Sequence, residues 1–423
     1  MKRFLLCLVL LVCPCSLFAS EPASVANAAL NTRSRSEIFQ YSPEIEPYVS
    51  FLKNHAKNPV DYILELFEKY DIIVLATTDH REINQWDFFY TLTSDKRFRT
   101  RVGNVFSEDG GSIKNQQEVD SFLDSKNCDS AKVLGILRDY VFFPEGWKRP
   151  NIFDYLTKVW RLNENSSPEE RIRFFLTDVY WDWNDIKNKE EYDKYMASIS
   201  TINFHDKEKS RDNIAAENIA CVFKKKLFKK KALVFFNTRH AYKRNTFSVN
   251  GRELYLPSVA ARLSEKFPGK VASLMMNFVG AVRNGQTKEE NPTQGGKWDA
   301  AFKVMQNIPM GFDLGNSPFG KDNFDYFAEL GGVPGITYEN IFDGMIFWRP
   351  LSEFTTKEGI NGFWDDKYKQ RVSAIFEKLS DSKKAKEILD MSLEELNKIT
   401  TETPYNKDEF SAKIEKWLIC NPR

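Results

Sequence analysis

The chain has 423 residues and nearly balanced charge, with 60 Lys and Arg against 59 Asp and Glu. This balance argues against a nucleic-acid or other polyanionic partner for the whole molecule, because such partners select strongly basic surfaces. The length suffices for one large or two ordinary domains, each with a substantial hydrophobic core.

The first twenty residues have the layout of a cleaved secretory signal. Two early cations precede an apolar run from Phe4 to Val12, and small residues follow at Ala19 and Ser20. This run is too short and wrongly flanked for a stable membrane span, and no later segment of the sequence is long and apolar enough to be one. We therefore expect an exported protein, either periplasmic or secreted.

Cysteines within and after this signal raise two further questions. Cys13 and Cys15 suggest a lipoprotein signal, in which a cysteine is lipidated after cleavage, but Val12 and Pro14 fit such a site poorly. The lipid anchor is therefore the less favoured alternative. Removal of the signal leaves three scattered cysteines, Cys128, Cys221 and Cys420. An odd number at irregular spacing does not indicate a disulfide scaffold, although one bridge stays open.

Two amphipathic helices are predicted next, because apolar residues recur at helical spacing over 45–52 and over 60–67. Asn58 can cap the second helix, and Pro59 suits its first position. The period then changes in the sequence DIIVLA, residues 71–76, which is a continuous apolar run rich in β-branched residues. Such a run is typical of a strand that is buried on both faces.

Strands and helices alternate along the rest of the core. Further strand-like runs occur at 101–108, 171–178, 231–237, 270–278 and, less clearly, 342–348. Helical segments lie between them at 82–94, 116–125, 151–162, 210–226 and 258–267. Helices that alternate with buried strands require crossover connections, so the sequence predicts an α/β fold with a mostly parallel central sheet flanked by helices.

Composition divides the chain into five predicted segments. After the signal at 1–20, an N-terminal helical segment covers 21–57 and the α/β core covers 58–280. Residues 281–355, rich in Gly, Asn and Pro up to residue 335, are predicted to be a loop-rich insertion that ends in the last strand. Residues 356–423 return to a helical pattern and are predicted to form a C-terminal helical cap.

Charged and polar residues follow four of the predicted strands. His80 follows the first strand, Glu108 ends the second, Asp178 ends the third, and Arg239 and His240 follow the fourth. Ligands of an open parallel sheet gather outside the carboxyl ends of its strands. Two of the four histidines of the chain are therefore expected at the edge of the sheet where a binding site would form.

Two imidazoles and a carboxylate in one crevice support more than one kind of chemistry. A histidine that titrates near neutral pH can take a proton from water while a carboxylate orients it. The same residue types are common ligands of a catalytic metal, and spacing alone does not discriminate between the two. Such residues also serve as loop caps and as satisfied polar groups, so a purely structural role stands beside both.

Other residues carry weaker signals. Ser210 or Asp212 can cap the helix that precedes the fourth strand, and Arg211 could instead clamp an anionic or carbonyl group. Trp181 and Trp183 could stack on a ring substrate, although burial in the core or in a lid is the commoner use. His55, at a polar helix end, and His205, in a charged loop, are not expected in the site.

These motifs, in this order, resemble the erythromycin esterase and ChaN-like superfamily, which includes the TraB-like proteins. The family has a strand ending in Gly-Glu-x-x-His, a second strand ending in Glu, a helix with Arg-Asp near its start, and a strand ending just before a second His. The matching positions are Ala76, Thr77 and His80, then Glu108, then Arg211 and Asp212, then His240. The stretch RIRFFLTDVYWDW further resembles an uncharacterised bacterial branch, in which an Asp, here Asp178, ends the intervening strand. The resemblance covers roughly residues 58–280.

The resemblance implies a Rossmann-like fold and a site made of His80, Glu108 and His240, supported by Asp178, Arg211, Asp212 and Arg239. In the esterase branch the first His is a general base on water. TraB-like relatives are described as metal-dependent peptidases and ChaN-like relatives bind haem, so a divalent metal or haem is an implied cofactor. Thr77 departs from the family Glu, and Asp79, Glu82 and Asp109 are the candidates to replace that carboxylate.

The sequence therefore predicts an exported, hydrolase-like protein that activates water on an ester, lactone or peptide substrate. The alternative is a non-catalytic protein that binds haem or another ligand on the same fold, which Thr77 favours. A third alternative is an inert descendant that serves as an interaction surface.

Overall fold

The computed structural model describes residues 40–108, 110, 113–139, 143–146, 150–198, 210–225, 227, 229–249, 251–284, 287–326, 330 and 333–419. The predicted signal and its cysteines, together with Asp109, His205 and Cys420, lie outside these residues. All elements from Tyr41 onward belong to one compact unit.

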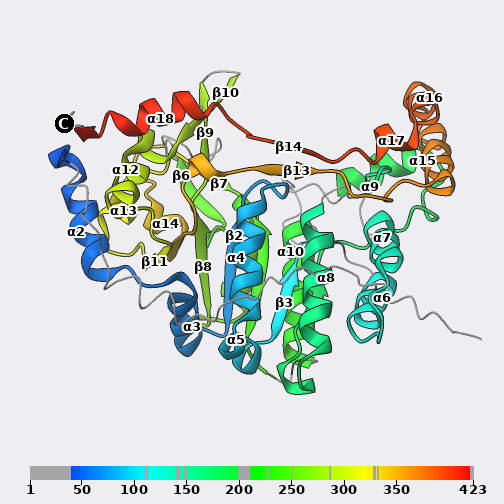
Figure 1. The fold of residues 1–423 in the computed structure, drawn as a ribbon, viewed down its shortest axis with the longest axis horizontal. Coiled ribbons are helices and arrows are strands. Elements are labelled where there is room, and N and C mark those ends of the chain that lie inside the picture. Colours follow the sequence, from blue (N-terminus) through cyan, green and yellow to red (C-terminus); the bar gives the residue numbers. More distant parts are fainter. Residues whose placement is uncertain are drawn as a thin grey trace, which may run out of the picture. The chain divides into compact units, whose positions relative to one another are not determined.

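A seven-stranded sheet forms the centre of this unit (Figure 1). In spatial order its strands are β11 (Met310–Asp313), β12 (Gly344–Phe347), β8 (Val271–Met276), β2 (Ile72–Thr77), β5 (Ala232–Asn237), β3 (Asn104–Ser107) and β4 (Arg173–Leu176). The neighbouring pairs are parallel except for β11 and β12, which are antiparallel. The predicted α/β fold with a mostly parallel sheet is confirmed, and every predicted strand segment contributes one strand to it.

Helices cover both faces of the sheet. One face carries α2 (Glu46–His55), α10 (Arg211–Lys225), α11 (Val259–Lys266) and α12 (Lys297–Val304). The other carries α3 (Pro59–Lys69), α4 (Ile83–Ser94), α5 (Lys96–Arg101), α6 (Ile113–Leu123), α7 (Ser130–Asp139) and α8 (Pro150–Glu164). Side chains of β2 alternate between the two cores, and all of its residues are buried, as the continuous apolar run predicts.

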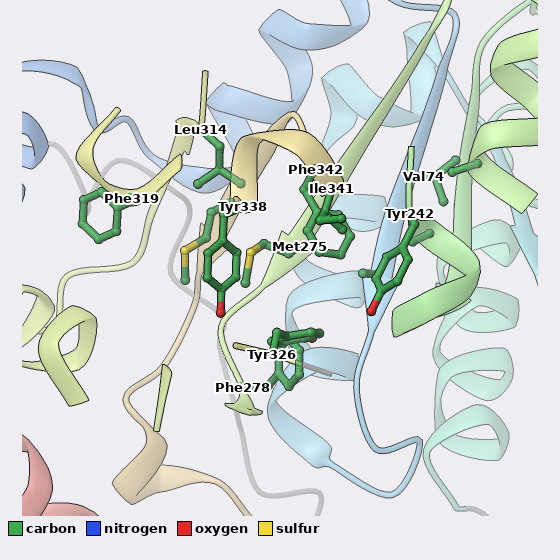
Figure 2. Packing of buried hydrophobic residues seen from close by; sticks show 14 of the residues in the cluster. Val74, Tyr242, Met275, Phe278, Leu314, Phe319, Tyr326, Tyr338, Ile341 and Phe342 are labelled. Atoms are coloured by element: carbon green, nitrogen blue, oxygen red, sulfur yellow. The ribbon is translucent and has the colours of Figure 1, made fainter. Parts of the chain in front are cut away.

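The core on the first face is rich in aromatic residues. Figure 2 shows Val74 and Met275, from β2 and β8, with Tyr242, Tyr338 and Phe342 around them. Tyr242 packs edge-to-face on Phe342, with ring centroids 5.7 Å apart. Aromatic pairs in this arrangement stabilise a core beyond the area that they bury.

The segment predicted to be loop-rich contains regular structure. Within residues 281–355 lie most of the hairpin β9 (Val279–Asn284) and β10 (Thr287–Pro292), then α12, β11, α13 (Pro318–Lys321), α14 (Tyr338–Ile341) and β12. Two of its glycines serve close packing rather than a loop, because Tyr62 of α3 lies against Gly311 of β11 and Gly344 of β12. A Cβ on Gly311 would lie 2.5 Å from a Tyr62 ring carbon, and a Cβ on Gly344 would overlap the Tyr62 hydroxyl.

The C-terminal region is mostly helical, as predicted, and packs in two places. Helices α15 (Asp366–Lys378), α16 (Ser382–Asp390) and α17 (Leu393–Leu396) join the core of the second face, whereas α18 (Lys407–Glu415) joins the core of the first. Between them runs an antiparallel ribbon of β13 (Thr356–Glu358) and β14 (Thr400–Glu402), which crosses above β2 and α4 in Figure 1. We call residues 353–358 with 400–405 the C-terminal strap.

Smaller elements complete the described chain. They are β1 (Gln40–Tyr41), α9 (Lys189–Ser198), the hairpin β6 (Thr246–Val249) and β7 (Arg252–Tyr255), β15 (Leu418–Ile419), and the 3-10 turns Pro43–Ile45, Pro168–Glu170, Thr238–Ala241, Thr293–Gly296 and Leu351–Glu353. Among the helices of the described chain, none combines the length and the apolar composition needed to cross a membrane.

Because Tyr62 lies against the two glycines, one methyl group added at Gly344 is expected to destabilise the fold. Gly344→Ala places Cβ against the Tyr62 hydroxyl, which donates a hydrogen bond of 2.7 Å to Asp313, so the ring cannot move without losing that bond. We expect the free energy of unfolding to fall by about 1–3 kcal/mol in urea denaturation. Gly315→Ala is the control, since a Cβ there meets nothing within 4 Å. Equal stability of the two variants would contradict this account.

Candidate active site

The predicted site residues follow strands that are neighbours in the sheet. Thr77, the last residue of β2, pairs with Asn237, the last residue of β5, and Ser107 of β3 pairs with Phe235. Because β2, β5, β3 and β4 are parallel, their carboxyl ends meet at one edge of the sheet. The loops that carry the site residues therefore start close together.

His80 and Glu108 are in direct contact at this edge. His80 Nε2 lies 2.6 Å from Glu108 Oε1, and their side chains are 15% and 5% exposed. The other carboxylate oxygen, Oε2, accepts a hydrogen bond from the backbone N–H of Asn237 at 3.2 Å. Glu108 is thus fixed between the loop after β2 and the end of β5.

Glu108 stays ionised despite its burial. Burial alone would raise its pKa, but the attraction to His80 and the hydrogen bond with it, then the charges of Arg211 and His240, hold the pKa of Glu108 well below its usual range. Three side chains from separate parts of the sequence, Arg211 and the two site histidines, thus act on one carboxylate.

The loop that carries His80 is held on α4 and α8. The His80 carbonyl accepts hydrogen bonds from Trp86 Nε1 at 3.1 Å and from Asn151 Nδ2 at 2.9 Å. The backbone N–H of Thr78 donates to Gln85 Oε1 at 2.8 Å. These bonds fix the backbone on both sides of the imidazole, so its position is set before any ligand binds.

Carboxylates near Thr77 serve other partners. Asp79 is bound by Arg81, with Nη2 2.6 Å from Oδ2. Glu82 caps α4, and its two oxygens accept hydrogen bonds from the N–H groups of Asn84 and Gln85 at 2.8 and 2.9 Å. Thr77 itself is buried, and its hydroxyl has no hydrogen-bond partner among the described residues. Asp79 and Glu82 therefore do not stand in for the carboxylate that the resembled family has at this position.

Arg211 and Asp178 form a buried ion pair. Arg211 Nε and Nη2 donate to the two oxygens of Asp178 at 2.8 and 2.5 Å. Burial alone would lower the pKa of Arg211, but Asp178, and then Glu108 and Asp212, raise it. The guanidinium thus clamps a carboxylate of the chain itself in bidentate geometry, and not the external anionic or carbonyl group that the sequence left open.

Asp212 is the partner of the second histidine. Its Oδ1 lies 2.5 Å from His240 Nδ1, and its side chain is fully buried. The helix cap is Ser210, whose hydroxyl accepts from the N–H of Asn213 at 3.2 Å. Arg239 donates to the Pro257 carbonyl at 2.6 Å and lies 3.9 Å from Asp212. A carboxylate so placed fixes the orientation of the His240 ring.

A cavity of about 500 Å³ opens at this edge of the sheet. Of the predicted site residues, His80 alone belongs to the wall of the described cavity. Glu108 contacts His80 but does not line the cavity, and neither does His240. The wall combines polar and apolar groups: Thr78, Asp79, His80, Arg81, Glu82, Asn237, Thr238, Phe278, Val279, Glu290, Tyr326, Phe354, Glu358, Pro404 and Tyr405. Figure 2 shows Phe278 and Tyr326 side by side.

The C-terminal strap supplies part of this wall, which sequence reasoning missed. It is hydrogen-bonded to the loop after β2, because Ile83 N–H donates to the Thr355 carbonyl and Lys357 N–H to the Arg81 carbonyl, each at 2.9 Å. Arg81 Nη1 also donates to Glu358 at 2.8 Å across 277 residues of sequence. A contact over such a separation leaves no periodic signal in the sequence.

The aromatic pair Trp181 and Trp183 lies outside the cavity wall. Both residues are 4% exposed and pack with Ile375 of α15 and with Leu379, which follows that helix. Trp181 and Trp183 therefore form part of a small separate core. Cys128 and Cys221 are exposed free thiols.

The side chains at this edge of the sheet do not fit the implied cofactors, a divalent metal ion or haem. Among the described residues, no group of three or more His, Cys, Asp or Glu side chains is placed to hold a metal ion together. Haem needs an axial ligand, and His80, the histidine in the described cavity wall, already has Nε2 against Glu108. His80 and Glu108 instead form a direct imidazole–carboxylate contact.

The fold and the site define an α/β protein with two imidazole–carboxylate pairs at the carboxyl edge of its sheet. No protein family and no curated protein matches the sequence. Among solved structures, a succinoglycan biosynthesis protein is 11% identical, with a TM-score of 0.47 over 75% of this chain and 98% of its own. A mutant of the erythromycin esterase EreC in its open conformation is 10% identical, with a TM-score of 0.44 over 73% and 96%.

A protein from Bacillus cereus is 12% identical, with a TM-score of 0.41 over 73% of this chain and 97% of its own. At these identities and TM-scores, nothing about activity is carried over from these proteins.

The buried Glu82 predicts a pH dependence of stability. Burial raises its pKa from 4.5 to about 7. Because the pKa is higher in the folded than in the unfolded protein, the protonated Glu82 carboxyl contributes stability that is fully present below about pH 4.5. This contribution is lost as the pH rises to about 7, and the free energy of unfolding falls by about 3 kcal/mol. Glu82→Gln should abolish this decline in urea denaturation across that pH window.

Because Glu82→Gln also weakens the cap of α4, the slope of stability against pH, and not its absolute value, is the quantity to compare. The exposed Glu68, changed to Gln, is the control and should keep the wild-type slope. An unchanged slope in Glu82→Gln would show that this carboxyl titrates normally.

Proposed function

We propose that the protein is a hydrolase that activates water on an ester, lactone or peptide substrate, with His80 as the base. The observation that carries this proposal is the contact of 2.6 Å between His80 Nε2 and Glu108 Oε1, with His80 in the wall of a 500 Å³ cavity. An oriented imidazole beside an ionised carboxylate is the arrangement that general base catalysis needs.

In the proposed reaction His80 takes a proton from a water molecule in the cavity while the water oxygen adds to the substrate carbonyl carbon. The imidazolium then gives its proton to the leaving oxygen or nitrogen as the bond to the carbonyl carbon breaks. Glu108 orients the imidazole and stabilises its positive charge, since its own pKa is held low. This step needs no group beyond the chain, the substrate and water.

His240 is proposed to stabilise negative charge that develops on the carbonyl oxygen. The Asp212 carboxylate fixes the His240 ring, and the interaction of His240 with Glu108 lowers the pKa of Glu108. Because His240 is not part of the cavity wall, we expect it to act less strongly than His80. Asp178, Arg211 and Arg239 are proposed as fixed charges that keep the two imidazole–carboxylate pairs in place.

Export remains part of the proposal and is supported by the composition of residues 1–20. N-terminal sequencing of the protein from the periplasm or the medium would locate the cleavage, and a lipid on Cys13 or Cys15 would favour the anchored alternative.

Removal of His80 is expected to lower kcat/KM by about 10²–10⁴-fold, which is the usual contribution of a positioned base. His240→Ala should lower it by a smaller factor, and Glu108→Gln should affect kcat more than KM. The assay screens the mature protein against panels of p-nitrophenyl esters, lactones and peptides, with and without divalent metals. His55→Ala, on the exposed end of α2, is the control. No turnover on any panel, or turnover indifferent to both site histidines, would overturn the proposal.

The second candidate function is ligand binding without turnover. It is favoured by Thr77, whose buried hydroxyl stands where the resembled family has a carboxylate. For haem as that ligand we expect a flat titration, because a haem bond to His80 Nε2 would have to displace Glu108. A Soret shift in the wild-type protein that disappears in His80→Ala would contradict this expectation and would favour the binding function.

A further inference from the structure

A second cavity, of about 150 Å³, lies between α12, α18 and the turn Leu351–Glu353. We call it the Asp299 pocket, after the carboxylate in its wall. Its apolar lining includes Leu351, Phe410 and Ile414. A single buried water needs only about 10–15 Å³ of such space, so the pocket has room for a small ligand. None of the residues assigned to the proposed reaction lines it.

Asp299 is the third residue of α12, and its carboxylate is accessible but unpaired. The residue is partly exposed, and neither of its oxygens is among the fully buried polar atoms without a partner. Within the described part of the chain, the one polar group that acts on this carboxyl is its own backbone N–H. The cavity that the residue lines is the Asp299 pocket, so a ligand there can reach the oxygens.

The cation that would normally pair with Asp299 has another partner. Lys303 follows four residues later on α12, which is the spacing of a helical ion pair. Its ammonium group is bound instead to Glu415 of α18. Lys407 also lines the pocket, but neither lysine is among the groups that act on the Asp299 carboxyl. The pocket therefore contains a carboxylate without a compensating cation from the described chain.

The acidity of Asp299 reflects this lack of a cation. Burial raises its pKa to about 7, and no positive neighbour opposes the rise. Glu108 shows the opposite case, because cationic partners hold its pKa low despite burial. At neutral pH and above, ionised Asp299 thus carries a desolvation cost that a cation from outside the chain would offset.

We propose that the Asp299 pocket is a second ligand site, for a small primary amine. The ammonium group of the amine donates hydrogen bonds to the Asp299 carboxylate, and its short hydrocarbon chain packs on Leu351, Phe410 and Ile414. The site is independent of the proposed hydrolase function. Tyr405 belongs to the walls of both cavities, so an amine bound here lies beside the C-terminal strap that also lines the His80 cavity.

The experiment titrates the full chain at pH 8 with n-butylamine, followed by calorimetry or ligand-observed NMR. Butan-1-ol is the neutral probe of the same shape, and butanoate is the anionic one. We expect the amine to bind with a Kd of about 0.1–10 mM, as suits a ligand of its size. Butan-1-ol and butanoate should bind at least about tenfold more weakly, because neither supplies a cation to the carboxylate.

Asp299→Asn removes the charge and keeps the shape of the side chain. We expect Kd for n-butylamine to rise about 5- to 20-fold, with the weak binding of butan-1-ol unchanged. The melting temperature without ligand at pH 8 should stay the same or rise, because an uncompensated charge has been removed. A merely structural role of Asp299 would instead lower the melting temperature and leave Kd unchanged.

The pH dependence of binding is a second test that needs no variant. n-Butylamine stays protonated between pH 6 and pH 8, so a change in its affinity over this range reports on the protein. Because Asp299 ionises near pH 7, we expect Kd to fall about tenfold from pH 6 to pH 8. The charged groups around the carboxyl, Lys303, Lys407 and Glu415, do not titrate in this range at their ordinary pKa values.

Asp408→Asn is the matched control. Asp408 also lies in the first turn of a helix, α18, but it is exposed and does not line the pocket. Its replacement removes the same net charge and should leave Kd and its pH dependence unchanged. An equal loss of affinity in both Asn variants would show a general charge effect and would overturn the proposal.

Two further results would also overturn it. One is a wild-type protein that does not bind n-butylamine at tens of millimolar, which would mean that the pocket holds water alone. The other is butan-1-ol binding as tightly as the amine, which would mean that Asp299 does not select the ligand. Neither result involves ester or peptide turnover, so the hydrolase proposal stands or fails separately.

Discussion

The buried carboxylate of Glu108 constrains the geometry of the whole site. Removing an anion from water costs several kcal/mol unless cations and hydrogen-bond donors replace the water. Here His80, Arg211 and His240 all act on that one group, and each comes from a different element: the loop after β2, the start of α10, and the turn after β5. The strand order that places β5 between β2 and β3 is what brings these elements together. A fold with another order would leave the carboxylate without its partners.

The cavity depends on a second constraint, which is the attachment of the C-terminal strap to the loop after β2. The two backbone hydrogen bonds and the Arg81–Glu358 pair hold residues that are far apart in sequence at the mouth of the sheet. The strap is anchored at both ends, because α15 packs in one core and α18 in the other. The position of the strap therefore depends on both cores. Loosening of either core would displace Phe354 and Tyr405 in the cavity wall.

Sequence reasoning succeeded where local pattern decides the outcome and failed where distant contacts decide it. The continuous apolar run of β2 and the polar residues just past the strand ends located the sheet and the edge where His80 and Glu108 meet. The pairing of Arg211 with Asp178 could not be read from the chain, because a buried guanidinium binds any suitably placed anion. Gly311 misled the composition argument, since its role is to admit Tyr62 and not to form a loop.

The charge inventory of the site also gives Thr77 a physical context. Asp178, Asp212 and Glu108 supply three negative charges, and Arg211 and Arg239 supply two positive ones, so the cluster is already short of one positive charge when both histidines are neutral. Another carboxylate at Thr77, which pairs with Asn237 at the end of β5, would add a buried anion without adding a cation. A hydroxyl there avoids that cost, and it leaves His80 with Glu108 as the carboxylate that holds it. The departure from the family pattern is thus compatible with an oriented base, although it removes one of the donors that a shared metal ion would need.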